Sequence, residues 1–428
     1  MKVIISAVGD TDPIRGNHDG PLLHISRVYR PEKILLIYSE GMLHKEERIK
    51  KAILSISESY APEIIVESQV IKDEEVFRFD RMFEVLQEII LRNTNDTDEF
   101  ILNLSSATPQ IISALFTINK INDFDIKAVQ VSTPKKRSNR NNPDDDKELS
   151  CLIAQNKDQI EEFEQRTIEE NAEKFSHSLI KRNLRALIQT FDYQAAYDLL
   201  LNPENSQVIS KSKRKKLLNQ LEGIVLAIKY QKVLPDIAEL LSHEDKVRKA
   251  FNYFLIIDLN YRRGLVTDVL IKSKSLAEFI FQDYIETRDR DLISIENGRP
   301  KLNLEHPQIH KFYNSINLSF KKRLGNKDDT IEYDIHSTLN ILSFIDIIDC
   351  LEKNNHITQF AKPVIVLNEA RNKVAHGLAE MDPQQVNNKQ LRQLVGSLKE
   401  LLMTVYQIKE TEFDYFYRKN KGLLELLN

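Results

Sequence analysis

The sequence predicts an α/β domain with a parallel sheet at the N-terminus and all-α structure in the remainder of the chain. Residues 2–132 alternate short, continuous apolar runs with helical segments, and from about residue 149 the helical period dominates. Glycine is scarce, with 11 among 428 residues, which favours long helices with few special backbone positions. At roughly 150 residues per domain, the length fits two or three domains.

Five apolar runs predict the strands of the first domain. They span residues 2–8, 34–38, 63–68, 100–104 and 126–131, with helices expected at 43–60, 75–91 and 109–119. Continuous apolar strands separated by helices are typical of a parallel sheet that is covered on both faces. Ligands of such sheets bind beyond the carboxyl ends of the strands.

Two of those strand ends carry polar loops that suit a ligand. The first loop contains Gly9, Asp10, Thr11 and Asp12, and the second contains Ser105, Ser106, Ala107, Thr108 and Gln110. In the second loop we expect Thr108 to cap the following helix and Pro109 to take its first position. Free N–H groups and hydroxyls at a helix N-terminus bind phosphate. The alternative is two ordinary βα turns capped by small polar residues.

Two nucleotide-binding motifs are absent from the sequence, and their absence narrows the class of nucleotide that these loops could bind. It contains neither GxGxxG nor GxxxxGK[ST], which argues against a dinucleotide fold of the usual kind and against a P-loop. Asp10 and Asp12 would repel a nucleoside triphosphate in the absence of a metal, but they suit ribose hydroxyls and adenine amines. We therefore expect a nucleotide ligand whose negative charge is spread over the molecule at low density.

Residues 135–147 mark the sharpest break in composition, since they are basic, then polar, then acidic, and we expect a loop or linker there. Beyond it we expect a long amphipathic helix over 167–201, a helix opened by the basic, solvated cluster 211–216, a hairpin at 292–298, and apolar helices over 338–351, 364–374 and 391–408. The predicted domain limits are 1–147, 148–260 and 261–428.

One short segment combines a cation, an amide and a titratable imidazole, namely Arg371, Asn372 and His376. We expect Pro363 to open a helix that Gly377 ends, which places His376 in the last turn, where carbonyl groups favour the imidazolium. Arg371 lies roughly 140° round the helix from His376, so one copy does not aim both side chains at one phosphate. Two copies facing each other would bring both pairs together.

The spacing Arg-Asn-x-x-x-His resembles the RxxxxH signature of HEPN ribonucleases. The resemblance implies a reaction that needs no metal: a ribose 2′-hydroxyl attacks its own 3′-phosphate, His376 moves protons, and Arg371 holds the charge on the phosphate oxygens. The alternative is that Arg371 and His376 are ordinary surface or capping groups near a helix end.

Taken with the segment from Asn103 to Gln110, this motif extends the resemblance to the whole chain. The order of parts is similar to the type III-A CRISPR ancillary ribonucleases, in particular their streptococcal and enterococcal branch. That resemblance implies a Rossmann-like CARF domain at 1–147, a helical linker at 148–260 and a HEPN domain at 261–428.

The resemblance also implies the function. A cyclic oligoadenylate, with cyclic hexaadenylate favoured over cyclic tetraadenylate, activates cleavage of single-stranded RNA in antiviral defence, and some relatives degrade their own activator. The protein is expected to be a homodimer with one composite ligand site and one composite catalytic site. The catalytic residues are expected to be Arg371, Asn372 and His376. The ring is expected to contact Gly9, Asp10, Thr11, Asp12, Ser105, Ser106, Ala107, Thr108, Gln110, Ser132 and Thr133.

Composition sets the remaining expectations. With a net charge of −4, the chain does not resemble a general nucleic-acid coat, and we expect local RNA contacts and no stable DNA binding. Cys151 and Cys350 lack a disulfide or metal pattern and are expected to be buried thiols in a reducing cytoplasm. We expect no cofactor, no metal site and no membrane contact, since no apolar run approaches the ~20 residues that span a bilayer.

Two other functions stay open at this point. A nucleotide-sensing regulator without catalysis would bind nucleic acid through its helical half, using the basic cluster at 211–216. An interaction protein would use Arg371 and His376 as a structural lock between two copies. Alanine variants of these two residues would then become monomers, whereas the catalytic interpretation expects intact dimers.

Overall fold

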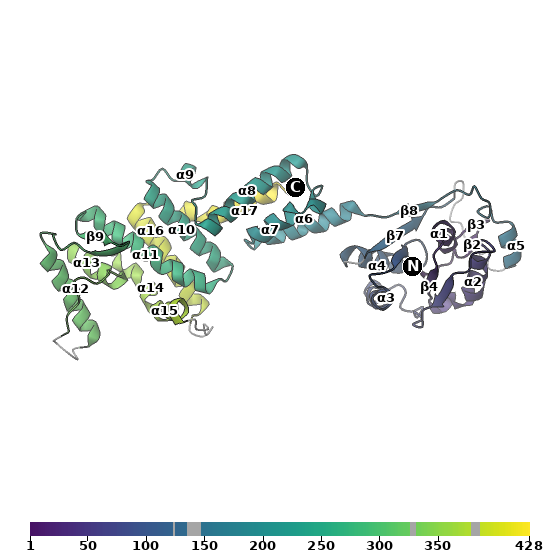
Figure 1. Ribbon diagram of the computed structural model, residues 1–428, viewed down its shortest axis with the longest axis horizontal. Helices are drawn as coiled ribbons and strands as arrows, with labels where there is room; N and C mark the ends of the chain where they lie inside the picture. The colour runs from purple at the N-terminus through teal and green to yellow at the C-terminus, as the bar shows by residue number, and fades with distance from the viewer. Residues whose placement is uncertain (123–124, 135–146, 326–330, 378–385) are drawn as a thin grey trace. The chain divides into compact units, whose positions relative to one another are not determined.

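The computed structural model describes the whole chain except residues 123–124, 135–146, 326–330 and 378–385, and the side chains of 373–377 also lie outside the described part. The chain divides into two compact units, Met1–Ser176 and His177–Asn428 (Figure 1). The domain limits expected from the sequence stay predictions.

The first unit is built on a six-stranded sheet in the order β5-β4-β1-β6-β7-β8. Its strands are β1 (Lys2–Ala7), β4 (Lys33–Ile37), β5 (Glu63–Val66), β6 (Glu99–Asn103), β7 (Ile126–Val131) and β8 (Thr167–Glu169). The first five are parallel to one another, and β8 runs antiparallel to β7. All five predicted strands are therefore confirmed.

Successive side chains along each strand point to opposite faces of this sheet. Ile5 and Leu35 pack with one pair of helices, α3 (Phe79–Asn93) and α4 (Pro109–Ile121). Ile4 and Ile34 pack with the other helices, which are α1 (Pro21–Tyr29), α2 (Glu46–Leu54) and α5 (Leu149–Ala154). Figure 1 shows these elements around the sheet. The apolar runs are thus buried on both sides, as a covered parallel sheet requires.

Several short elements of this unit were not expected. They are the ribbon of β2 (Ile14–Arg15) and β3 (His18–Asp19), the helix α1, the 3₁₀ helix η1 (Glu40–Lys45), the helix α5 and the strand β8. The ribbon turns at Gly16 and Asn17, both with positive φ. A two-residue strand has no periodicity for a sequence pattern to reveal.

The single helix expected over 167–201 is wrong. The segment contains β8, then α6 (Glu173–Gln189) and α7 (Tyr193–Leu201). Between the two helices, Phe191 adopts a left-handed conformation (φ 61°) and the Asp192 carboxylate accepts from the N–H of Ala195, which caps α7. Pairing with β7 overrides the helical pattern at the start of the segment.

Among its described residues, the second unit is helical apart from one hairpin. Its remaining elements are η2 (Pro203–Asn205), α8 (Lys211–Tyr230), α9 (Ile237–Leu240), α10 (Asp245–Arg262), α11 (Val266–Arg288), β9 (Ile293–Glu296), β10 (Arg299–Leu302), α12 (Ile309–Leu324), α13 (Ile341–Leu351), η3 (Thr358–Ala361), α14 (Lys362–Val366), α15 (Asn368–Gly377), α16 (Asn388–Tyr406), η4 (Glu410–Asp414) and α17 (Tyr415–Glu425). The hairpin turns at Asn297 and Gly298, both with positive φ, as the Asn-Gly pair predicts.

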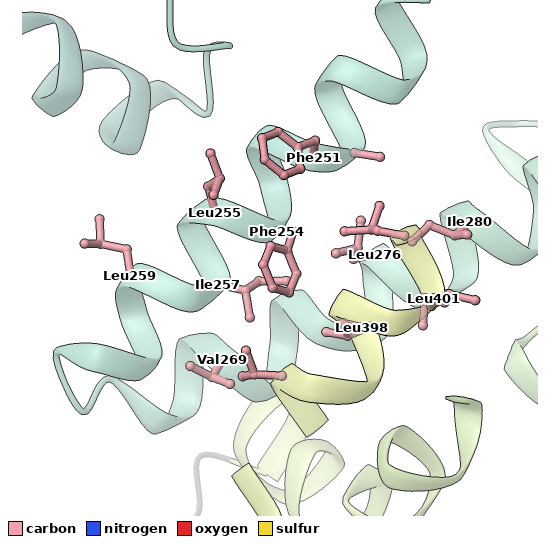
Figure 2. Packing of buried hydrophobic residues seen from close by; sticks show 14 of the residues in the cluster. Phe251, Phe254, Leu255, Ile257, Leu259, Val269, Leu276, Ile280, Leu398 and Leu401 are labelled. Atoms are coloured by element: carbon pink, nitrogen blue, oxygen red, sulfur yellow. The ribbon is translucent and has the colours of Figure 1, made fainter. Parts of the chain in front are cut away.

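The core of this unit lies between α10, α11 and α16. Figure 2 shows Leu398 and Leu401 of α16 beside Leu276 and Ile280 of α11, with Phe254 of α10 close by. The predicted apolar face of α16 is therefore part of the hydrophobic core of its own chain. Burial of these side chains fixes α11, against which α15 packs.

The helix expected over 364–374 is divided in two. Leu367 leaves the helical region (φ −92°, ψ 2°) after α14, and α15 begins at Asn368. The run of β-branched residues Val364, Ile365 and Val366 before the break has weak helix propensity.

Cys151 is exposed and Cys350 is half-buried, so the expectation of buried thiols is wrong.

Among the described residues, no helix combines the length and the apolar character that crossing a membrane demands.

Candidate functional sites

The helix α15 carries the predicted catalytic motif. Its backbone runs from Asn368 to Gly377, so His376 stands in the last turn as expected, although the His376 side chain lies outside the described residues. The Arg371 guanidinium is partly buried and its Nη1 donates to Oδ1 of the exposed Asn372 (3.0 Å). A hydrogen bond therefore joins the cation and the amide at the surface of α15.

The surroundings of Arg371 come from α11. Lys274 and Ser273 line a small pocket together with Arg371. Behind Lys274, at 3.8 Å from its Nζ, lies the carboxylate of Glu278, which also accepts from the backbone N–H of Ile341 (3.1 Å). Burial raises the pKa of the Glu278 carboxyl, while Lys274, the Ile341 N–H and Arg371 oppose that rise. Two cations thus stand beside one carboxyl group, which suits an anionic substrate.

The two predicted ligand loops of the first unit meet at the carboxyl edge of the sheet. Gly9 of the first loop lies so close to Ala107 of the second that a Cβ atom at Gly9 would stand 2.4 Å from the Ala107 backbone nitrogen. Ala107 itself has a positive φ of 86°, which is uncommon for a residue with a side chain. The sequence placed both loops at one edge, and the structure brings their backbones into contact.

Asp12 holds the first loop together from inside. Its side chain is buried, with Oδ2 accepting from the Gly9 N–H (3.1 Å) and Oδ1 from the Leu22 N–H at the start of α1 (3.0 Å). Burial raises the pKa of the Asp12 carboxyl, and hydrogen bonds from the Ser106 hydroxyl and these two amides act against the rise. Both Asp12 oxygens thus have partners inside the protein, and its contact with a ligand stays a prediction.

Lys45 is a residue of this site that sequence reasoning missed. Its side chain is fully buried, and Nζ donates to the carbonyl oxygens of Asp10 (2.8 Å) and Asp12 (3.3 Å). The Asp10 carboxylate, 72% exposed, points outward with one oxygen 3.7 Å from the same Nζ. A lysine among the charged residues of 44–51 gives no signal of burial, since only the fold turns it inward.

The serines of the second loop are also tied to the sheet. The Ser105 hydroxyl accepts from the Val131 N–H (2.8 Å) at the end of β7, and the Ser105 N–H donates to Asn103 (2.9 Å). The buried Ser106 hydroxyl accepts from the Asn103 amide (2.8 Å), which also donates to Ser6 of β1 (2.9 Å). Asn103 therefore links the ends of β1 and β6 to the loop, a role that the sequence did not reveal.

The other predicted contacts form the accessible part of the edge. Thr108 caps α4 as expected, accepting from the Ile111 N–H (3.4 Å). Thr11 and Gln110 are half-buried, and Ser132 and Thr133, which follow β7, are exposed. The edge thus presents small polar side chains and a capped helix N-terminus, a combination that suits a phosphate-containing ligand.

Comparison with known proteins assigns both units. The Cas_Csm6 CARF domain model matches residues 63–174, and the Cas_Csm6 HEPN domain model matches residues 240–424. A CRISPR system endoribonuclease Csm6 of Streptococcus thermophilus is 43% identical over 430 residues, which cover 100% of both chains. A relative of the same name from Enterococcus italicus is 25% identical, again over 100% of both chains.

A solved structure supports the fold. Enterococcus italicus Csm6 bound to cyclic hexa-2′-fluoro-hexa-dAMP matches with a TM-score of 0.66 and 23% identity, covering 100% of both chains. The similarity in sequence extends over the full length and includes both domain types, so the chain belongs to the Csm6 family of CRISPR system endoribonucleases, which combine a CARF domain with a HEPN domain.

Proposed function

We propose that this protein is a metal-independent endoribonuclease that a cyclic oligoadenylate switches on, and that it acts as a symmetric homodimer in antiviral defence. The observation that carries the proposal is the geometry of α15. Arg371 and Asn372 form one hydrogen-bonded unit five and four residues before His376, which stands in the last turn of the helix. Two such helices related by a twofold axis supply two cations and two imidazoles to one phosphate.

The proposed reaction cleaves RNA by transesterification. The 2′-oxygen attacks the adjacent phosphorus while the bond to the 5′-oxygen of the next nucleotide breaks, which leaves a 2′,3′-cyclic phosphate and a 5′-hydroxyl. One His376 accepts the proton of the 2′-hydroxyl, and the partner subunit's His376 donates a proton to the leaving oxygen. Arg371 stabilises the charge on the phosphate oxygens, and Asn372 orients its guanidinium.

The activator is proposed to lie on the carboxyl edge of the sheet. The side chains of Asp10, Ser132 and Thr133 are exposed there, and those of Thr11, Thr108 and Gln110 are half-buried. Gly9, Asp12, Ser105, Ser106 and Ala107 shape the loops behind them. Cyclic hexaadenylate is the favoured ring, because the solved relative was bound to a hexameric ring of this chemistry.

The test is a cleavage assay on a labelled single-stranded RNA. It compares no activator, cyclic tetraadenylate and cyclic hexaadenylate, each with and without EDTA. We expect fragments ending in 2′,3′-cyclic phosphate only when a ring is present, at lower concentrations of the hexamer, and with no effect of EDTA. Equal cleavage without any ring, or cleavage that EDTA abolishes, would contradict the proposal. Chromatography of the recovered ring tests whether the protein also degrades its activator.

A further inference from the structure

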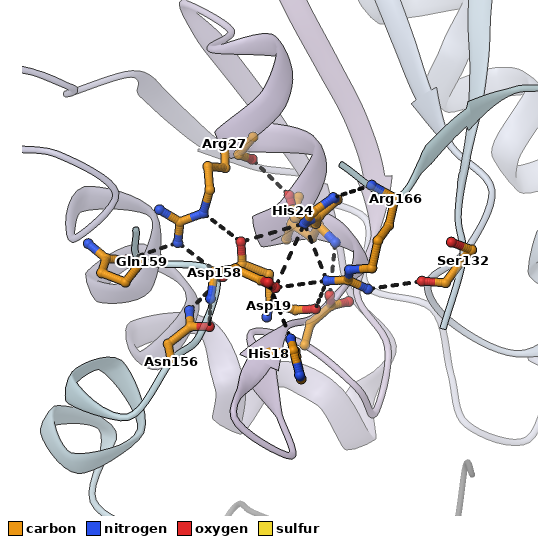
Figure 3. A network of polar contacts seen from close by, with 12 residues as sticks. His18, Asp19, His24, Arg27, Ser132, Asn156, Asp158, Gln159 and Arg166 are labelled. Carbon is orange, nitrogen blue, oxygen red and sulfur yellow. Dashed lines mark hydrogen bonds and ion pairs between the residues drawn. The ribbon is translucent and has the colours of Figure 1, made fainter. Parts of the chain in front are cut away.

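A buried polar cluster stands behind the proposed activator edge. It joins Asp19 of β3, His24 and Arg27 of α1, and Asp158 and Arg166 from the segment between α5 and β8, and we call it the Arg166 cluster (Figure 3). All five side chains are buried except for a few per cent of their surface. None of the five was singled out by the sequence, because they lie far apart along the chain.

The charges in the cluster balance. Arg27 binds both oxygens of Asp19 (2.6 and 3.0 Å), and Arg166 donates through Nη2 to Asp158 (2.9 Å). His24 accepts from the backbone N–H of Arg166 through Nε2 (3.0 Å), so its ring proton is on Nδ1. Two carboxylates thus face two guanidinium groups, which makes their burial tolerable.

A metal ion is the obvious alternative occupant. One ligand atom from each of Asp19, His24 and Asp158 lies within 4.8 Å of the others. The Arg166 Nη2 already stands among them, 2.9 Å from Asp158 Oδ2, 3.3 Å from His24 Nδ1 and 2.9 Å from the Asp19 carbonyl oxygen. The guanidinium therefore occupies the place of a cation, and the geometry gives it a different role.

That role concerns Ser132. The Ser132 N–H donates to the Arg166 carbonyl oxygen (2.9 Å), and the Arg166 Nη1 donates back to the Ser132 carbonyl oxygen (2.9 Å). Arg166 thus binds both polar backbone groups of Ser132, one with its backbone and one with its side chain. The regular ladder between β7 and β8 ends just before, with the pair of Val131 and Thr167.

We propose that Arg166 is a positioning residue of the activator site: anchored by Asp158 and Asp19, it fixes the peptide that presents Ser132 and Thr133 at the carboxyl edge of the sheet. This inference rests on the proposed function, because the proposed function is what assigns activator binding to that edge of the sheet. A fixed peptide lowers the entropy lost when the ring binds, so loosening it weakens affinity. Arg166 itself has no need to touch the ring.

Arg27 provides a matched control. It is buried to the same extent as Arg166 and pairs with the Asp19 carboxylate, but its remaining hydrogen bond goes to Gln159 (2.9 Å) rather than to Ser132. Arg166→Lys keeps the charge near Asp158 but cannot also reach the Ser132 carbonyl oxygen. Arg27→Lys makes the same chemical change on the other side of the cluster. Asp158→Asn is a milder variant that removes the negative charge facing Arg166, at a side chain that also accepts from the Asp19 N–H (2.8 Å) and lies 3.2 Å from His18 Nδ1.

The experiment measures binding of cyclic hexaadenylate by calorimetry, with a melting curve for each variant. We expect Kd to rise about tenfold in Arg166→Lys, the effect of one lost charge-assisted hydrogen bond on a preorganised loop, and in the same direction in Asp158→Asn. Arg27→Lys should keep the wild-type Kd within about twofold while losing a comparable amount of thermal stability. Amide exchange at Ser132 and Thr133 should rise in Arg166→Lys and, in the same direction, in Asp158→Asn, but not in Arg27→Lys.

The outcomes separate this inference from the proposed function. Equal changes in Kd for the two lysine variants, or a wild-type Kd in Arg166→Lys, would overturn the positioning role alone. Unfolding of both Arg166→Lys and Asp158→Asn would also overturn it, since the cluster would then be purely structural. A wild-type protein that binds neither cyclic hexaadenylate nor cyclic tetraadenylate would remove the proposed activation and this inference with it.

Discussion

At the scale of single residues, hydrogen bonding within the protein divides the predicted site residues into two groups. Asp12, Ser105 and Ser106 bind other parts of the protein, whereas Asp10 and Ser132 are left at the surface. A sequence motif marks residues that a site requires, but it does not distinguish a ligand contact from a residue that shapes the loop. The distinction depends on which side of each loop faces the sheet.

His376 is the residue on which catalysis should depend most. His376→Ala should lower ring-activated RNA cleavage by at least about a hundredfold, because it removes both the proton acceptor and the proton donor of the proposed reaction. Cyclic hexaadenylate should bind with an unchanged Kd in calorimetry. The control is His310→Ala, a change at an exposed histidine of α12, which should leave cleavage intact. Undiminished cutting by His376→Ala would refute its role.

The first unit should lose stability in acid because of Asp19. Burial would raise the pKa of this carboxyl, but hydrogen bonds from His24 and Arg27 outweigh burial and lower the pKa to about 2. The stabilising contribution is therefore complete above the unfolded pKa of about 4 and is lost as the pH falls towards 2, a change of about 2 kcal/mol.

The measurement compares wild type with Asp19→Asn, which has no carboxyl to titrate. The difference in the free energy of unfolding, followed by amide exchange in α1 under urea, should narrow by about 2 kcal/mol between about pH 5 and about pH 2. A difference that stays constant over this range would show that Asp19 is not held as a carboxylate by the cluster.

At the scale of elements, the hydrophobic period and the length of a segment decided whether the sequence could predict its secondary structure. The five parallel strands were foreseen because each is a continuous apolar run buried on both faces. The two-residue strands β2 and β3 and the three-residue β8 carry no such pattern. The break at Leu367 was also missed, because the apolar period continues through it and only the packing of α14 and α15 shows the change of direction.

The contact between the loops after β1 and β6 depends on the absence of a side chain at Gly9. In Gly9→Ala the new Cβ would stand 2.4 Å from the Ala107 nitrogen, which is backbone and cannot swing away. We expect a loss of about 1–3 kcal/mol in unfolding free energy and weaker binding of cyclic hexaadenylate.

Gly396→Ala is the matched control for this change. Gly396 lies inside α16, and nothing stands within 4 Å of a Cβ built there. The alanine should therefore stabilise the protein by up to about 1 kcal/mol through helix propensity. Urea denaturation of the two variants tests the pair, and a Gly9→Ala protein as stable as wild type would mean that the loops are not in close contact.

At the scale of the whole molecule, the proposed chemistry requires two copies. If each active site takes one His376 from each subunit, a dimer of wild type with His376→Ala is inactive. An equimolar, equilibrated mixture should then retain about a quarter of the activity of the same total amount of wild type, rather than half. Titrating the variant into wild type in the activated RNA assay measures this dependence.

Two controls frame the mixing experiment. Wild type mixed with His310→Ala should keep full activity, which shows that mixing itself does no harm. A linear decline with the fraction of His376→Ala would mean that each subunit cuts alone, and the composite site would be abandoned. A variant that has become monomeric would instead support a structural lock between copies.

The sequence by itself determined the class of fold, the two polar loops at one sheet edge and the position of Arg371, Asn372 and His376 on one helix. These follow from short-range periodicity and from motif spacing, which a linear chain records directly. Only the tertiary structure decided that Asp12 and Lys45 are turned inward and that Arg166 holds Ser132. The contacts of Lys45 and Arg166 join residues more than thirty positions apart. The energies of all these contacts arise from burial and charge balance that exist only once the chain has folded.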